Sequence, residues 1–234
     1  QLERAPDPAW LRALRQNLVG GVALREERFD EAAAIFFEQD RLLAAVRGEE
    51  LSLIRTRNNL CGALNCLGRF EDAIAVAKSA IALGDEVGRG ALGYTFFQLL
   101  HSYLFLAELD QATETMRRAM PGWRRDAMVL LAADQLGLLL AEQGRVPDAV
   151  RIDAAAGAYT RRTGPRPHPV RVRARQRTAQ LVAAAHPEPA DLGRWQSEGE
   201  QLDEAAIAAI CLQNPVEREQ RVGPVAVAAG AVHQ

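Results

Sequence analysis

Apolar residues recur along this chain with the period of an α-helix, and no segment of credible length shows the alternation of a β-strand. The pattern predicts eight helices at about 9–25, 29–47, 51–67, 71–84, 90–106, 110–119, 123–143 and 147–161. Helix-ending residues separate several of them, namely Gly68, Gly84, Gly88, the pair Pro121 and Gly122, and Gly144. The chain is therefore expected to belong to the all-α class.

A six-residue pattern recurs four times, at the start of every second helix. Its copies read ERFDEA at 27–32, GRFEDA at 68–73, AELDQA at 107–112 and GRVPDA at 144–149. In each copy an apolar residue follows a turn, an acid favours the N-terminus of a helix, and a final alanine permits close helix approach. The alanines recur after 41, 39 and 37 residues, which corresponds to one helical hairpin per step.

The helix before each turn carries a matching inner face. Leu60, Leu99 and Leu136 each precede an alanine by thirteen residues. One position further along lie Gly20, Cys61, Leu100 and Gly137. These residues are expected to pack inside the hairpins.

Together these positions resemble the tetratricopeptide repeat. Its pattern of small and large apolar residues is matched by Gly20, Ala32 and Phe36 in the first copy and by Leu100, Tyr103, Ala112, Met116 and Ala119 in the third. The resemblance covers about residues 9–160. It implies a right-handed superhelix of about four hairpins, with an array over 1–160 and repeats at about 9–47, 51–84, 90–119 and 123–161. The spacing exceeds the usual ~34 residues, and Asp153 occupies a normally apolar position.

The hairpin pattern disappears after Gly164, although an apolar stripe of helical period continues. That stripe is formed by Val170, Ala174, Leu181 and Ala185. Two short helices should follow, the second beginning near Asp203. We expect residues 161–213 to cap the array and residues 214–234 to form a peripheral tail.

The end of the chain is also similar to that of bacterial multidomain regulators. Their closing segment, close to GxxLSLDEAxxLAL, is matched by Glu198, Gly199, Leu202, Asp203, Glu204, Ala205 and Ala206. The resemblance covers about 50–213 and implies a parent chain with a winged-helix, LuxR-type or cyclase domain joined to a signal-transducing ATPase. The chain opens at Gln1 rather than Met, which fits a fragment of such a protein. Its effector domains would then be partners of this module.

Composition narrows the functional classes. A net charge of −2 and a pI near 6.2 argue against a protein that mainly coats nucleic acid. The odd number of cysteines, three, favours a reducing cytoplasm, and no apolar run is long enough to predict a membrane span. Cys61 and Cys66 have the wrong spacing for a redox or metal pair, so we interpret them as buried structural residues.

Catalytic motifs are missing from the sequence. It contains no phosphate-binding loop and no dinucleotide fingerprint after a strand. The four histidines are scattered and match neither a catalytic triad nor a zinc motif. The sequence therefore predicts a non-catalytic protein without a cofactor or a metal ion.

The segment RRTGPRPHPVRVRARQR at 161–177 is strongly basic and has three interpretations. Its arginines could bind phosphates of a nucleic acid, cover the end of the array while meeting acids such as Glu198, Glu200 and Asp203, or dock on an acidic partner surface. The residues concerned are Arg171, Arg173, Arg175 and Arg177. Stacking aromatics and base-reading motifs are missing, so the covering role is preferred and direct nucleic-acid binding is disfavoured.

Stacked hairpins present a concave wall made by their first helices, which is the expected binding surface. The repeat register places candidate contact residues there: Arg55, Asn58, Asn65, Tyr94, Phe97, His101 and Asp134. The polar ones could bind a carboxylate or a backbone, and the aromatic ones could stack. Alternatively, they are solvated polar residues and packing aromatics.

The expected partner is therefore a protein, a peptide or a small-molecule effector, bound by the sensor part of a signalling or transcription regulator. Two other functions stay open at this point. One is nucleic-acid binding through the basic segment 161–177, and the other is structural oligomerisation, with a homodimer formed through the exposed ends of the array.

Overall fold

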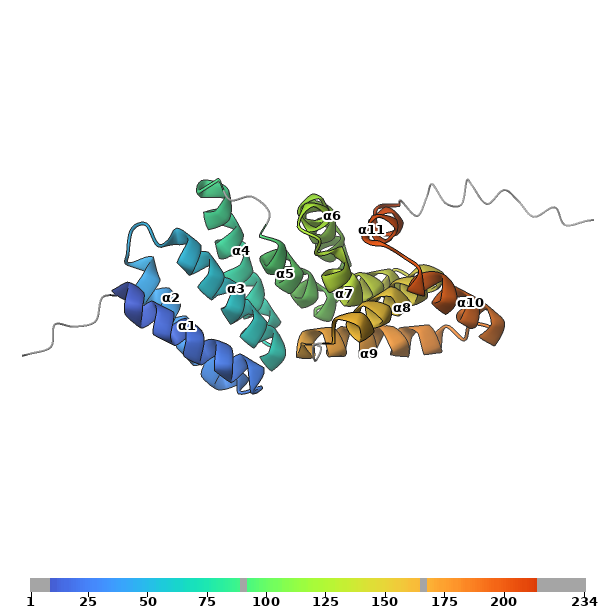
Figure 1. Ribbon diagram of the computed structural model, residues 1–234, viewed down its shortest axis with the longest axis horizontal. Coiled ribbons are helices and arrows are strands. Elements are labelled where there is room, and N and C mark those ends of the chain that lie inside the picture. Colours follow the sequence, from blue (N-terminus) through green and yellow to red (C-terminus); the bar gives the residue numbers. More distant parts are fainter. Residues whose placement is uncertain (1–8, 89–91, 165–167, 214–234) are drawn as a thin grey trace, which may run out of the picture.

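The computed structural model describes residues 9–88, 92–164 and 168–213, and within these ranges the chain forms helices and no strands (Figure 1). The helices are α1 (Ala9–Arg25), α2 (Phe29–Ala44), α3 (Glu50–Leu67), α4 (Phe70–Glu86), α5 (Gly93–Phe105), α6 (Leu109–Arg125), α7 (Val129–Glu142), α8 (Val146–Thr163), α9 (Pro169–Ala184), α10 (Pro189–Glu200) and α11 (Glu204–Leu212). The predicted all-α class is confirmed. The tail 214–234 lies outside the described residues.

The same backbone turn joins the two helices of each hairpin. Two residues before the second helix, the chain adopts a left-handed conformation at Glu27, Gly68, Ala107 and Gly144. The next N–H donates to the carbonyl five residues back, in pairs Arg28 to Ala23, Arg69 to Leu64, Glu108 to Tyr103 and Arg145 to Leu140, at 2.8–2.9 Å. This bond satisfies a carbonyl that the end of the first helix would otherwise leave free.

The alanines of the repeated pattern lie in the interior of the hairpins. Ala32, Ala73, Ala112 and Ala149 are all completely buried. The leucines thirteen residues earlier are buried as well. In the first hairpin, a methyl group added at Gly20 would lie 2.7 Å from the ring of the buried Phe36, so a larger residue there would have to displace that ring. The sequence pattern therefore predicted the hairpin interior.

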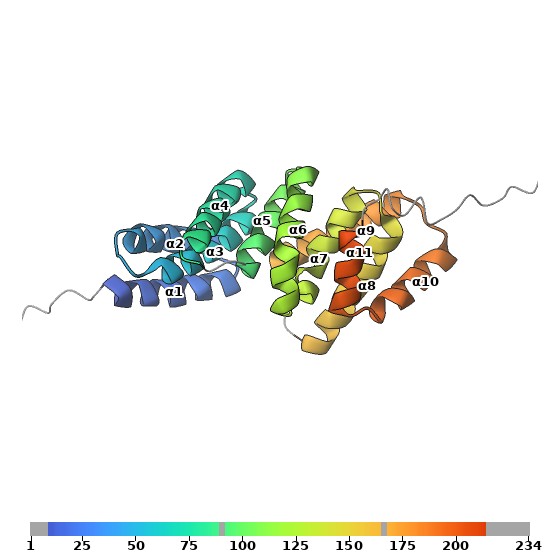
Figure 2. The ribbon, with the colours of Figure 1, turned by 90° about the horizontal axis from the view of Figure 1, so that it is seen from above.

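The hairpins stack in order from α1 and α2 at one end to the last helices at the other, as the view from above shows (Figure 2). Each first helix packs on the second helix of the preceding hairpin and also contacts the first helices beside it. Helix α7 lies at the centre of this end of the array, where α5, α6, α8, α9 and α11 all contact it. This explains why α7 is buried on nearly every side.

The predicted break at Pro121 and Gly122 is wrong. Helix α6 continues through Pro121 to Arg125, and the chain turns instead at Ala127, which is left-handed. Pro121 lies on the exposed side of α6, where water can satisfy the carbonyl that loses its partner. Trp123 holds the extra turn in place, because it is fully buried and donates from Nε1 to the Gly93 carbonyl at 2.9 Å.

The last three helices pack on the helices at the C-terminal end of the array. Helix α9 packs mainly on α7, α10 packs on α8, and α11 packs on α6 and α7. As predicted, the last helix begins beside Asp203, whose side chain accepts a hydrogen bond from the Ala206 N–H at 2.8 Å. Glu204 in turn accepts from the Leu130 N–H at 3.1 Å and so caps the N-terminus of α7.

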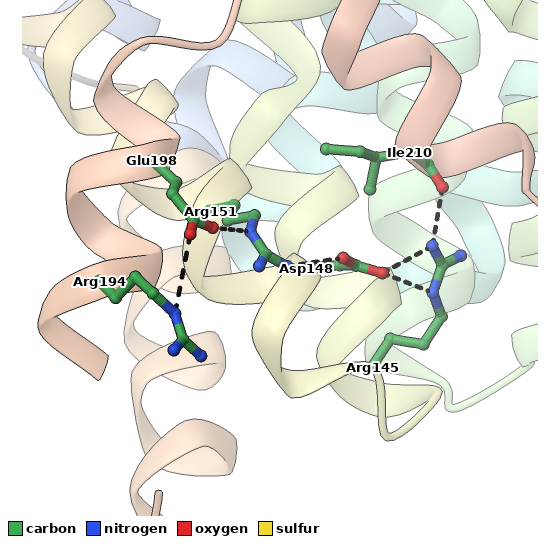
Figure 3. A network of polar contacts seen from close by, with 6 residues as sticks. All are labelled: Arg145, Asp148, Arg151, Arg194, Glu198 and Ile210. Carbon is green, nitrogen blue, oxygen red and sulfur yellow. Dashed lines mark hydrogen bonds and ion pairs between the residues drawn. The ribbon is translucent and has the colours of Figure 1, made fainter. Parts of the chain in front are cut away.

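A chain of charged side chains ties α10 and α11 to the start of α8 (Figure 3). Asp148 is buried and accepts from Arg145 and Arg151. Arg151 continues to Glu198 of α10 at 2.6 Å, while Arg145 donates to the Ile210 carbonyl of α11 at 2.8 Å. The last helices are therefore fixed to the repeat array by hydrogen-bonded charges as well as by apolar packing.

The contact between α8 and α10 depends on a glycine, and this gives a first prediction. A methyl group at Gly199 would collide with the Arg151 carbonyl and lie 2.8 Å from the Ala154 Cβ, whereas nothing lies within 4 Å of one at Gly193. We expect Gly199→Ala to lower the free energy of unfolding by about 1–3 kcal/mol. Chemical denaturation measures the change.

The matched control is Gly193→Ala on the same helix. It should leave stability unchanged or raise it by about 0.5–1 kcal/mol, because alanine favours a helix more than glycine does. Equal effects of the two substitutions would contradict the close approach of α10 to α8.

Candidate binding groove

The repeat register allows the concave wall to be compared from hairpin to hairpin. Fifteen residues before each alanine lie Asn17, Asn58, Phe97 and Asp134, and eleven before lie Gly21, Gly62, His101 and Leu138. In the first two hairpins Asn17, Gly21 and Asn58 are partly exposed, and only Gly62 is buried. In the last two hairpins all four residues at these positions are buried. Equivalent positions therefore have two different environments.

Helix α9 contributes to this difference, because it packs along α7 and reaches α3 (Figure 1). Asn65, Phe97, His101 and Asp134 are 0%, 5%, 0% and 1% exposed. The expectation that these four residues are accessible for binding is therefore wrong. All four side chains lie in the interior of the array, where a ligand on the concave wall cannot reach them.

Asp134 and Arg171 form the central contact beneath α9. The Arg171 guanidinium donates to Asp134 Oδ2, and both side chains are buried. Arg175 lies 3.5 Å from the same carboxylate and 3.2 Å from Asp153. Burial raises the pKa of the Asp134 carboxyl, and the guanidinium groups oppose that shift by favouring its charged form. Asp153, which departs from the repeat pattern, thus has a partner in α9.

Arg173 and Arg177 also have partners inside the molecule. Arg173 donates to the carbonyls of Asn65 at 3.0 Å and Cys66 at 3.1 Å, in the last turn of α3, where a cation is favoured by the helix dipole. Arg177 pairs with Glu142 at 3.1 Å. The basic segment is therefore not a free docking patch, because Arg171, Arg173, Arg175 and Arg177 all contact acids or carbonyls of the array.

His101 lies beneath this helix in an apolar setting. Its ring stands 4.5 Å from that of Phe105 and 6.1 Å from that of Phe70, measured between centroids. Neither ring nitrogen has a hydrogen-bond partner among the described residues. Burial, with smaller contributions from Arg173 and His168, lowers the pKa of His101 to about 3. The residue is therefore neutral near pH 7.

An open groove with a volume of about 660 Å³ runs along the first helices of the first three hairpins. Helices α1, α3 and α5 form its wall, and the start of α9 closes one side. The lining residues are Gly21, Leu24, Arg25, Glu27, Asn58, Asn59, Gly62, Tyr94, Gln98, His168 and Pro169. Of the predicted contact residues, the structure brings Asn58 and Tyr94 together here. Arg55 lies elsewhere, in a smaller hollow of about 250 Å³ beside Asn17.

A relay of side chains fixes the polar floor of the groove. Ser102 donates to Asn65 Oδ1 at 2.7 Å, and Asn65 Nδ2 donates to Gln98 Oε1 at 3.0 Å. The amide nitrogen of Gln98 therefore points the other way, toward Gly62 in the groove lining. Asn58 Oδ1 is buried and has no hydrogen-bond partner among the described residues. The groove lining thus holds the oriented amide of Gln98 together with the side-chain amide of Asn58.

The sequence did not single out Gln98 or Asn59 as contact residues. Both lie fourteen residues before a repeat alanine, directly after Asn58 and Phe97, which the repeat register did identify. Their shared register position was the available signal. The role of Asn65 also differs from the expected one, because it orients Gln98 and does not itself face the groove.

Other kinds of site receive no support from the described residues. They hold no group of three or more histidine, cysteine or acidic side chains placed to bind a metal ion, and none of their helices is long and apolar enough to cross a membrane. Cys61, Cys66 and Cys211 are free and buried, and burial raises the pKa of each thiol. These thiols are therefore poor nucleophiles.

Comparison with solved structures agrees with the repeat arrangement. A Podosopora anserina protein described as a kinesin light chain with nearly identical TPR-like repeats matches at a TM-score of 0.56, with 16% identity, over 90% of this chain and all of that chain. The chain has a tetratricopeptide-like repeat fold. A single-substitution variant of the same neighbour matches at a TM-score of 0.57 with 16% identity, over 93% of this chain and all of that one.

This likeness establishes the fold alone at such low identity. No family model and no curated protein matches the chain. The tetratricopeptide-like resemblance seen in the sequence is thereby confirmed, while the bacterial-regulator context stays a prediction.

The buried ion pair gives a second prediction. Asp134→Ala leaves the Arg171 guanidinium buried without its carboxylate, so we expect the free energy of unfolding to fall by about 3–5 kcal/mol. Glu142→Ala, which breaks the more exposed pair with Arg177, should cost about 1 kcal/mol or less. Replacing the buried pair with Asp134→Leu and Arg171→Met should recover most of the loss. Equal costs for the two single substitutions would exclude a special role for Asp134.

The buried histidine gives a third prediction. Because the pKa of His101 lies near 3 in the fold and near 6.5 in the unfolded chain, its contribution to stability is complete above pH 6.5 and is lost as the pH falls. Between pH 6 and 4, the protein should lose about 1.4 kcal/mol more per pH unit than His101→Phe does. Urea denaturation across this range measures both slopes. Parallel slopes would mean that His101 is accessible to protons in the fold.

Proposed function

We propose that this chain is a non-catalytic interaction module that binds a polypeptide segment in the open groove along α1, α3 and α5. The observation that carries the proposal is a pair of side-chain amides in the groove lining, Asn58 and Gln98, of which the relay from Ser102 through Asn65 fixes the orientation of Gln98. A peptide group has one N–H and one C=O, and this pair of side chains is complementary to both.

The rest of the lining also suits an extended chain. Gly21 and Gly62 carry no side chains, and a methyl group at Gly21 would meet nothing within 4 Å, so a ligand backbone can approach the wall closely. Tyr94 is 57% exposed at the rim and offers an aromatic face to a ligand side chain. Opposite charges at Arg25 and Glu27 give the groove no strong preference for one sign of ligand charge.

Nucleic-acid binding through residues 161–177 has less support. The arginines it requires already contact Asp134, Asp153, Glu142 and the last turn of α3. Releasing Arg171 to a phosphate would leave the buried Asp134 carboxylate without its main partner, which is costly. A peptide in the groove requires no such rearrangement.

The wider role we propose is that of the sensor or interaction part of a cytoplasmic bacterial signalling or transcription regulator. The proposal of this wider role rests on the resemblance of residues 198–206 to the closing segment of such regulators. Gly199 and Glu204 within that segment join α10 to α8 and α11 to α7, so the shared residues have a structural reason to recur. The groove wall includes the first residues of α9, which gives ligand occupancy a route into the last helices by population shift.

Selection from a phage-displayed library of random dodecapeptides, followed by calorimetry with a selected synthetic peptide, tests the groove. Asn58→Ala and Gln98→Ala should each weaken binding about tenfold, the equivalent of about one lost hydrogen bond in a partly buried site. Gln111→Ala is the matched control, because that exposed amide lies on α6 outside the groove. It should leave the affinity unchanged.

The proposal fails if no peptide binds saturably, or if binding is insensitive to both groove substitutions. Screening small metabolites against the same variants examines the small-molecule alternative. Sedimentation of the unliganded protein examines oligomerisation, for which Val19 of α1 is relevant because it is exposed whereas its equivalents Leu60, Leu99 and Leu136 are buried.

A further inference from the structure

A second cavity lies outside the groove, between α8, α9 and α10, with a volume of about 650 Å³. Helices α9 and α10 follow each other closely in sequence, yet α9 packs on α7 and α10 packs on α8. Within the described part of the chain these two helices make no extended contact with each other. Their divergence leaves a cleft whose floor is the outer side of α8.

Small and branched apolar side chains form much of this cleft. They are Val150 and Ala154 of α8, Ala179, Val182 and Ala183 of α9, and Leu192 of α10. The volume is within the range of about 300–1,000 Å³ that small-molecule sites occupy. The walls therefore suit an apolar ligand body.

Two guanidinium groups meet in the cleft above Gly157. A methyl group at this glycine would lie 3.1 Å from Arg175 Nη2 and 3.4 Å from Arg161 Nη1, so both groups come down onto the helix backbone side by side. Guanidinium groups bind carboxylates and phosphates through pairs of N–H donors. The polar end of the cleft is thus suited to an anion.

Glu200 shows where an anionic group sits. Its carboxylate pairs with Arg161 at 2.6 Å, and both side chains are mostly exposed, at 51% and 65%. Such a pair contributes little to stability, so a ligand carboxylate can replace Glu200 at small cost. Arg175 is held more firmly, because Asp153 and Asp134 lie 3.2 Å and 3.5 Å from it. Arg161 is therefore the exchangeable cation.

We propose that this cleft is a second binding site, which takes an amphipathic monocarboxylate of the medium-chain fatty-acid class. The carboxylate pairs with Arg161 beside Arg175 and displaces Glu200, while the hydrocarbon chain packs on Val150, Val182 and Leu192. Each methylene buried in this way strengthens binding about fourfold. The site does not depend on peptide binding in the groove, since the two cavities share no lining residue.

Isothermal titration of the full chain with sodium decanoate tests this site. Arg161→Gln should weaken decanoate binding about tenfold, because the ligand loses its exchangeable cation. Glu200→Gln should strengthen binding by about threefold or more, because the competing carboxylate is gone. These opposite changes distinguish a binding role from a general loss of structure, and both side chains are exposed enough to be replaced without unfolding.

Matched variants and probes complete the experiment. Arg194→Gln removes another exposed arginine, on the helix that carries Glu200 but outside the cleft lining, and should leave the decanoate affinity unchanged. Decanol and decyltrimethylammonium have the same chain with a neutral or cationic head and should bind at least tenfold more weakly.

The proposal is overturned if decanoate does not saturate the protein, if decanol or the cation binds as tightly, or if Arg161→Gln has no effect. Asn58→Ala, which is the test of the groove, should not change decanoate binding. Failure at one site is therefore distinguishable from failure at the other.

Discussion

The arrangement of the last third of the chain depends on one buried carboxylate, that of Asp134. A lone carboxylate inside a helical array would be strongly unfavourable, and so would the buried guanidinium of Arg171. Their mutual contact removes both penalties only when α9 lies against α7. The pair therefore selects one position for α9 more than it adds stability, and Arg173 reaches the end of α3 only in that position.

This placement divides a repetitive wall into two parts with different chemistry. In the last two hairpins, α9 covers part of the wall, so that Asp134 and His101 become buried. In the first two, the equivalent Asn58 and Gly62 keep contact with the groove. A repeat array that would otherwise present one continuous surface thus presents a short groove closed at one side by His168 and Pro169.

The repeats were predictable because their determinants are local. A turn, an alanine and a leucine at fixed spacing specify each hairpin without reference to the rest of the chain. The burial of Asp134 was not predictable in that way, because its partner Arg171 lies 37 residues later on a helix whose direction the periodicity does not determine. Asp153 was the usable sign, since an acid at an apolar repeat position requires a cation from outside the repeat. Position within the register thus identified the wall, but not what covers it.

Helix α9 connects the two cavities physically. Its first residues close the groove, its middle carries the arginines bound to Asp134 and Asp153, and its second half forms one wall of the cleft. Arg175 belongs both to the buried charge cluster and to the cleft lining, so one side chain links the contact that holds α9 in place to the second cavity. Coupling between the two sites would therefore require α9 itself to shift, and thermodynamic linkage would make the effect equal in both directions. A helix fixed by charges at its centre and lined with cavities at both ends is thus suited to couple two ligands.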